Sequence, residues 1–124
     1  MATLALALLV QASASAPASE KLDCKPGYEA TLAALRQAPD ARTGTPPPGA
    51  PFGVIEHSAS RTLYTYTLPG AAGHPAIVRR QIVQRGGQVD LDMSACGWGD
   101  KTGFDTLMKQ FHELNEQMKA SLGK

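Results

Sequence analysis

The sequence predicts an α+β domain: a four-stranded antiparallel meander with an N-terminal and a C-terminal helix packed on one face, and one disulfide. Two periodic patterns and the presence of only two cysteines lead to this fold class. Residues 76–93 alternate apolar and polar side chains around Gly86–Gly87, which is typical of two strands joined by a tight turn. Residues 103–121 carry apolar side chains every three or four positions, which is typical of an amphipathic helix. Helices flanking an antiparallel run of strands define the α+β class.

The first helix is expected within residues 25–39 (KPGYEATLAALRQAP). Pro26 suits the first helical position, Glu29 suits the positive end of the helix dipole, and Pro39 ends the run. Its apolar face consists of Tyr28, Leu32 and Leu35.

A proline-rich segment separates this helix from the strands. Residues 39–51 carry five prolines and two glycines, so we favour a stiff connector over a proline-rich ligand for another protein. Strand-like runs follow at 52–57 and 62–68. In the second run Tyr64 and Tyr66 share a face with a leucine, and that face is either an outward aromatic platform for a partner or part of the core. The leucine favours the core.

The hairpin at 76–93 is expected to have one face in the core and one in water. Its apolar face collects Val78, Ile82, Val89, Leu91 and Met93. Its polar face carries Arg79, Gln81, Arg85, Gln88, Asp90 and Asp92. On that polar face we expect the arginines to pair with the aspartates across the strands.

The C-terminal helix, at about 103–121, is expected to pack on the sheet along one continuous apolar stripe. The stripe consists of Phe104, Leu107, Met108, Phe111, Leu114, Met118 and Leu122. Thr102 and Asp105 have the spacing of a capping box at the start of this helix.

Residues 1–18 are interpreted as a secretory signal peptide and residues 19–124 as a single small α+β domain. The apolar run Leu4–Val10 is followed by small residues that fit an Ala-x-Ala cleavage site. A flexible tail or a small N-terminal helix is the alternative, and the abrupt change to polar residues at Ser19 favours the signal. We therefore expect an exported protein, and favour the periplasm over the extracellular medium.

Charge and hydropathy limit the classes of partner. The formal net charge is +1, which argues against nucleic acid or an anionic membrane surface because both require clustered Lys and Arg. No stretch is apolar enough to cross a bilayer, so we expect no membrane insertion. The oligomeric state is left open.

Cys24 and Cys96 are expected to form a structural disulfide, since paired cysteines are the rule in exported proteins. Two free thiols, a metal pair and a redox pair are the alternatives. The Cys-x-x-Cys spacing used by redox motifs and many zinc sites is absent.

Residues 95–104 (ACGWGDKTGF) have the outline of a phosphate-binding loop: a strand, a glycine-rich turn, Lys-Thr and a helix. That motif requires glycine where this chain has Ala95 and Asp100, which excludes nucleotide binding of this kind. We expect Asp100 or Thr102 to cap the helix, with an anion at its N-terminus as the alternative. Trp98 either packs as an anchor or contacts a partner. The candidate partner-binding residues are Trp98, Asp100, Lys101, Tyr64 and Tyr66.

No metal site, cofactor or catalytic centre is expected. The three histidines, His57, His74 and His112, have no ligand spacing between them. The chain has no Gly-x-Ser-x-Gly nucleophile motif, and its cysteines are expected to be oxidised. Glu56 could form a carboxylate pair with an aspartate of the hairpin, but pairing of those aspartates with arginine is the simpler interpretation.

The leading functional hypothesis is a non-catalytic, exported protein-binding domain, such as an inhibitor, an immunity protein or an envelope accessory protein. The alternative is a carrier of a small apolar ligand, with a cleft between the sheet and the C-terminal helix. Met108, Phe111 and Met118 would line that cleft, although the same residues also suit the core. An enzyme ranks third.

Overall fold

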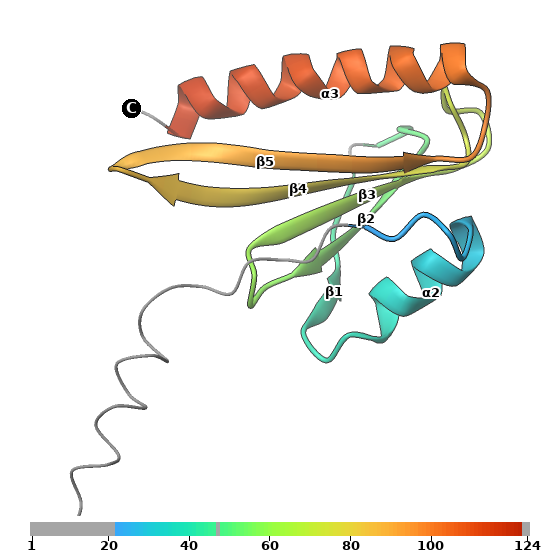
Figure 1. Cartoon of the computed structure of the whole chain (residues 1–124), viewed down its shortest axis with the longest axis horizontal. Helices are drawn as coiled ribbons and strands as arrows, with labels where there is room; N and C mark the ends of the chain where they lie inside the picture. The colour runs from blue at the N-terminus through green and yellow to red at the C-terminus, as the bar shows by residue number, and fades with distance from the viewer. Residues whose placement is uncertain (1–21, 47, 123–124) are drawn as a thin grey trace, which may run out of the picture.

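A computed structural model describes residues 22–46 and 48–122, and the predicted signal peptide lies outside this part of the chain. The elements are α2 (Tyr28–Gln37), β1 (Ala41–Thr43), β2 (Phe52–His57), β3 (Thr62–Thr67), β4 (Ala76–Arg85), β5 (Gln88–Gly97) and α3 (Lys101–Leu122). The five strands form one antiparallel sheet in the order β1-β2-β3-β4-β5 (Figure 1). The predicted α+β class with an antiparallel meander is confirmed.

The predicted number of strands is wrong, because β1 adds a fifth. It lies within the segment interpreted as a connector and pairs with β2, with Thr43 opposite Ile55. A three-residue strand is too short to show a periodic pattern. It precedes the run of prolines, so its backbone N–H groups remain available for pairing.

The two helices lie on opposite faces of the sheet, so the expectation of one shared face is wrong (Figure 1). Leu32 of α2 packs with Ile77 of β4, whereas Leu107 of α3 packs with Val78 of the same strand. Consecutive residues of a strand point to opposite faces. β4 is therefore buried on both faces, and every residue from Ala76 to Gln81 is buried.

The stripe of α3 differs from the expected one near its middle. Leu107 and Phe111 are buried, as predicted, but Leu114 is 45% exposed. The next buried residue is Asn115, with 7% exposure. Four-residue steps from Leu107 through Phe111 reach Asn115, which leaves Leu114 on the flank of the helix.

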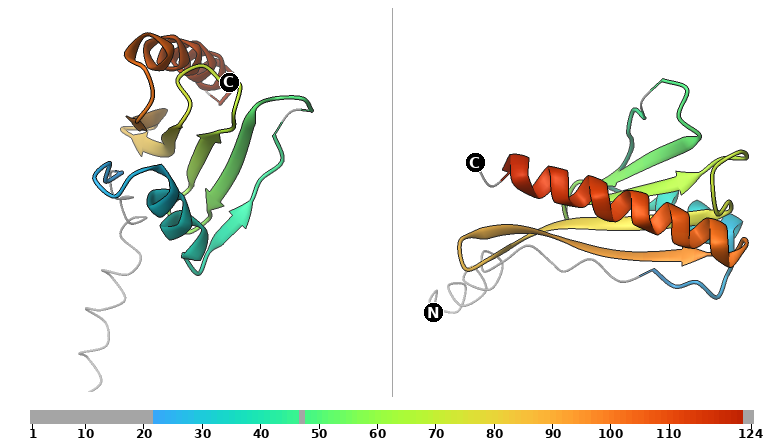
Figure 2. Two further views of the ribbon diagram at one scale, coloured as in Figure 1. Left: turned by 90° about the vertical axis from the view of Figure 1, so that its right-hand side faces the viewer. Right: turned by 90° about the horizontal axis from the view of Figure 1, so that it is seen from above.

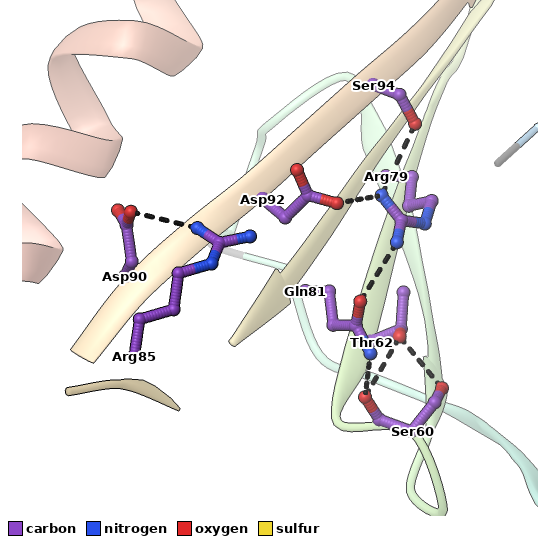
Figure 3. A network of polar contacts seen from close by, with 8 residues as sticks. All are labelled: Ser60, Thr62, Arg79, Gln81, Arg85, Asp90, Asp92 and Ser94. Carbon is purple, nitrogen blue, oxygen red and sulfur yellow. Dashed lines mark hydrogen bonds and ion pairs between the residues drawn. The ribbon is translucent and has the colours of Figure 1, made fainter. Parts of the chain in front are cut away.

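The polar face of the hairpin does not face water along its whole length. Arg79 is only 1% exposed and Gln81 only 6% exposed. Arg79 Nη1 donates a hydrogen bond to Asp92 Oδ2 at 3.3 Å, and Arg79 Nη2 donates one to Gln81 Oε1 at 3.0 Å (Figure 3). The predicted pairing of arginine with aspartate is confirmed here and at Arg85–Asp90, at 3.3 Å. Polar neighbours satisfy these groups, which allows this face to be buried close to the centre of the sheet.

The predicted disulfide is confirmed. Cys24 and Cys96 are bonded, with their Cα atoms 5.5 Å apart. The bond joins the segment before α2 to the end of β5, directly ahead of α3.

Candidate functional site

The turn between β5 and α3 is a structural joint. The Trp98 indole Nε1 donates a hydrogen bond to the Cys24 carbonyl at 2.9 Å, and its ring meets Tyr28 edge-on, with centroids 6.0 Å apart. The Trp98 backbone N–H donates to the Pro75 carbonyl at 2.9 Å. These contacts support the anchor role for Trp98. Its contact with a partner stays a prediction.

Close packing of backbone accounts for two glycines of this turn. A Cβ atom on Gly99 would lie 2.4 Å from the His74 carbonyl oxygen. A Cβ atom on Gly103 would lie 2.6 Å from the Gly73 backbone nitrogen. Both distances are shorter than real Cβ contacts, so only glycine fits. Two of the three glycines that suggested a phosphate-binding loop therefore serve the packing of the turn and the start of α3 against the loop before β4.

Polar residues of the same turn serve the start of α3. Asp100 Oδ2 accepts a hydrogen bond from the Gly103 N–H at 2.7 Å, so Asp100 and not Thr102 caps the helix. Lys101 forms an exposed ion pair with Asp105 at 2.9 Å, one turn further along. A bound anion would have to compete with the Asp100 carboxylate for the first N–H groups.

The two candidate tyrosines point toward α2. Tyr64 is 5% exposed and belongs to the cluster around Leu32, and its ring lies 4.8 Å from that of His57. Tyr66 is half-buried under the guanidinium of Arg36, 5.2 Å from its ring centroid. Tyr64 therefore belongs to the core, and Tyr66 lies at the edge of it.

His57, His74 and Asp90 have structural partners. His57 Nε2 lies 2.9 Å from the Leu35 carbonyl, and His74 Nδ1 lies 2.7 Å from Thr67 Oγ1. A backbone hydrogen bond from the next residue and the neighbouring ammonium of Lys119 lower the pKa of the Asp90 carboxyl. In the described ranges no three His, Cys, Asp or Glu side chains are grouped so that they could hold a metal ion.

A groove of about 550 Å³ lies on the α3 face of the sheet. Seen from above, α3 follows β4 and β5 and leaves the β1–β2 side of this face uncovered (Figure 2). The apolar wall of the groove consists of Leu63, Ile82, Val89, Leu91 and Met118. All five are half-buried, so their remaining apolar surface is open to a ligand. Of the residues expected to line a cleft, only Met118 does so, while Phe111 and Met108 belong to the core.

Arg80 borders this groove and is 9% exposed. Its Nη1 donates to Asn115 Oδ1 at 3.4 Å and to Met118 Sδ at 3.3 Å. Its guanidinium lies over the Phe111 ring, 4.9 Å from the centroid. Its Nε is buried without a hydrogen-bond partner. Burial lowers the pKa of Arg80.

The sequence predicted a cleft between the sheet and the C-terminal helix as one of two functional hypotheses, but it did not predict Arg80 as part of that site. One signal was available: Arg80 lies between Val78 and Ile82 at two-residue spacing, so it must share their apolar face. Because adjacent residues of a strand point to opposite faces, one of two adjacent arginines has to lie on the same face as Val78 and Ile82.

Comparisons with models of protein families, with curated proteins and with solved structures found no match. The function is therefore inferred from the groove and from the side chains around it.

Proposed function

We propose that this protein is a non-catalytic carrier that binds a small, largely apolar ligand in the groove between α3 and the sheet. The observation that carries the proposal is the apolar wall described above, five half-buried side chains that line the same groove. Large apolar side chains left partly exposed together mark an interaction site far more often than isolated ones do.

The size of the groove supports a small ligand. Its volume of about 550 Å³ falls within the range of about 300–1,000 Å³ that is usual for small-molecule sites. Polar groups at its margin, including Arg42 and Glu56, would orient a ligand whose body lies on the apolar wall.

The disulfide and the helices also bear on the cellular compartment of the protein. The disulfide is compatible with an oxidising compartment outside the cytoplasm. None of the helices in the described part of the chain is both long and apolar enough to cross a membrane. We propose that the carrier is exported and acts in the periplasm.

Native mass spectrometry of freshly purified protein, together with titration of the uncharged dye N-phenyl-1-naphthylamine, tests the carrier. We expect either a retained small molecule or an increase in dye fluorescence. Leu63→Gln, in the groove wall, should weaken dye binding by about tenfold, because the dye loses apolar contact there. Leu114→Gln, at an exposed position on α3, is the matched control and should leave binding unchanged. A clean mass with no dye response would contradict the carrier.

Protein binding through the turn before α3 is the second candidate. Trp98 is half-exposed, and the disulfide segment and close backbone packing hold it in place, which suits a binding hot spot. Affinity capture from an envelope extract tests this candidate. A partner whose capture is lost with Lys101→Glu, an exposed change outside the core, would support it. A partner insensitive to both Lys101→Glu and Trp98→Ala would remove the turn as the contact.

A further inference from the structure

The strongest unexplained feature is a buried positive charge beside the groove. No carboxylate of the described residues lies within ion-pair distance of Arg80, and its Nη1 acceptors are a neutral amide and a thioether. Burying a guanidinium without an acidic partner is costly, because neither acceptor replaces the charge compensation that water and ions provide.

The neighbouring Arg79 shows how this chain accommodates a buried arginine that belongs to the structure alone. It lies on the opposite face of the same strand and is still more buried, yet it contacts Asp92, Gln81 and Ser94 (Figure 3). An acid and neutral acceptors therefore surround one arginine of the pair. The other arginine has only neutral acceptors and borders an apolar groove.

The geometry points to a single-chain carboxylate amphiphile, of the fatty-acid class, whose carboxylate binds Arg80 and whose tail lies on the apolar wall. This inference rests on the proposed carrier function and names the chemistry of its ligand. A carboxylate accepts strong, charge-assisted N–H bonds from a guanidinium. Nη1 is engaged by Asn115 and Met118, and Nε is enclosed by the protein without a partner, so Nη2 is the nitrogen left to meet the carboxylate of a ligand in the groove.

Charge around the groove favours an anion. Arg42, Arg61 and Arg80 line it, against the single carboxylate of Glu56. In the described part of the chain Arg42 and Arg61 form no ion pair, so their charge remains available to attract an anionic head group. The exposed arginines would steer the ligand, and the buried one would hold it.

The test compares three ligands of equal chain length. Dodecanoate, dodecan-1-ol and dodecyl phosphate are titrated below their aggregation concentrations against the full-length protein, with displacement of the uncharged dye as the readout. We expect dodecanoate to bind about tenfold or more tightly than dodecan-1-ol, because a charge-assisted hydrogen bond contributes at least about that factor. Acetate alone should not displace the dye, because the tail supplies the apolar contact.

Variants assign the preference to Arg80. Arg80→Met should remove the preference for dodecanoate and leave the affinity for dodecan-1-ol within about twofold, because the tail contacts remain. Arg85→Met removes an exposed arginine of the same hairpin and should keep the preference. Arg80→Lys keeps the charge but loses the planar guanidinium and the position of its donors, so it should reduce the preference without removing it. That variant also serves if Arg80→Met does not fold.

The outcomes separate the two proposals. If the dye does not bind and the native mass shows no retained small molecule, the carrier function fails. If the alcohol and the carboxylate bind equally to the wild type, the groove stands and the anion inference fails. A preference of undiminished size in Arg80→Lys, or any preference that remains in Arg80→Met, would overturn the role of Arg80. Arg80-dependent binding of dodecyl phosphate tighter than that of dodecanoate would overturn the carboxylate assignment.

Discussion

Gly103 provides a test in which two physical effects have opposite signs. It lies in the first turn of α3 and donates its N–H to Asp100. Glycine inside a helix is less stable than alanine by up to about 1 kcal/mol, because it loses more backbone entropy on folding. Helix propensity alone therefore predicts that Gly103→Ala stabilises the protein.

Packing predicts the reverse. The new Cβ atom would lie 2.6 Å from the Gly73 nitrogen and 3.0 Å from the Gly73 Cα. Both are backbone atoms. The approach is equally close from the other side, because a Cβ atom added at Gly73 would lie 2.8 Å from the Phe104 Cα. Relief requires the loop and the helix to move apart, and overpacking of this kind costs about 1–3 kcal/mol. After subtracting the propensity gain, we expect Gly103→Ala to lower the free energy of unfolding by about 1 kcal/mol or more.

Urea unfolding at equilibrium, followed by far-ultraviolet circular dichroism, measures this difference. Gln110→Gly and Gln110→Ala form the control pair, since Gln110 is exposed in the same helix. There the alanine variant should be the more stable by up to about 1 kcal/mol. The reasoning is refuted if Gly103→Ala is as stable as the wild type or more stable, because the close approach of the two backbones would then carry no cost.

Three further predictions concern the stability of the fold. Reduction of the Cys24–Cys96 disulfide, whose cysteines are 72 residues apart in the sequence, should lower the free energy of unfolding by about 4 kcal/mol in the chain-entropy model. Urea unfolding with and without reductant measures this loss, and a loss below about 1 kcal/mol would contradict the prediction. Burial, and next the nearby carboxylate of the following residue, raise the pKa of the Tyr28 hydroxyl above 10.0. The stabilising contribution of the protonated Tyr28 hydroxyl is therefore complete below the pKa of the unfolded state, and it is lost as the pH rises through the higher pKa of the folded state. Across this alkaline range the free energy of unfolding of Tyr28→Phe should fall less than that of the wild type. Leu107→Ala, at a fully buried position, should cost about 2–5 kcal/mol in urea unfolding, whereas Leu114→Ala should change the stability by no more than about 0.5 kcal/mol.

Local periodicity was enough to predict the hairpin, the last helix and the class of the fold. It could not assign the helices to faces, because the alternation in residues 76–93 indicates only one buried face, whereas β4 is buried on both. β4 has apolar side chains on both faces, with Ile77 on the α2 side and Val78 on the α3 side. The faces of a central strand are decided by what packs on them, and that information is not local.

The site was harder to predict than the fold for a related reason. The glycine-rich turn resembles a phosphate-binding motif in sequence, yet Gly99 and Gly103 are explained by contact with His74 and Gly73, which lie 25 and 30 residues earlier in the chain. Arg80 was not predicted as a site, because the neighbouring Arg79 already fitted the predicted polar face of the hairpin. The burial of Arg80 depends on Phe111 and Asn115, which contact it only when α3 is packed on the sheet.

Asn115 connects the packing of α3 to the groove. Up to Phe111 the buried stripe of the helix is apolar and fills the space above β4. One turn later the stripe becomes polar, because the Asn115 side chain accepts a hydrogen bond from Arg80 through Oδ1 while its Nδ2 lies 3.1 Å from Met93 Sδ. An apolar residue there would leave Nη1 of Arg80 with the thioether of Met118 as its hydrogen-bond acceptor, and the cost of burying the charge would rise. The polar break in the stripe therefore keeps the guanidinium beside the groove, where an anionic ligand can supply the compensation that the described side chains do not provide.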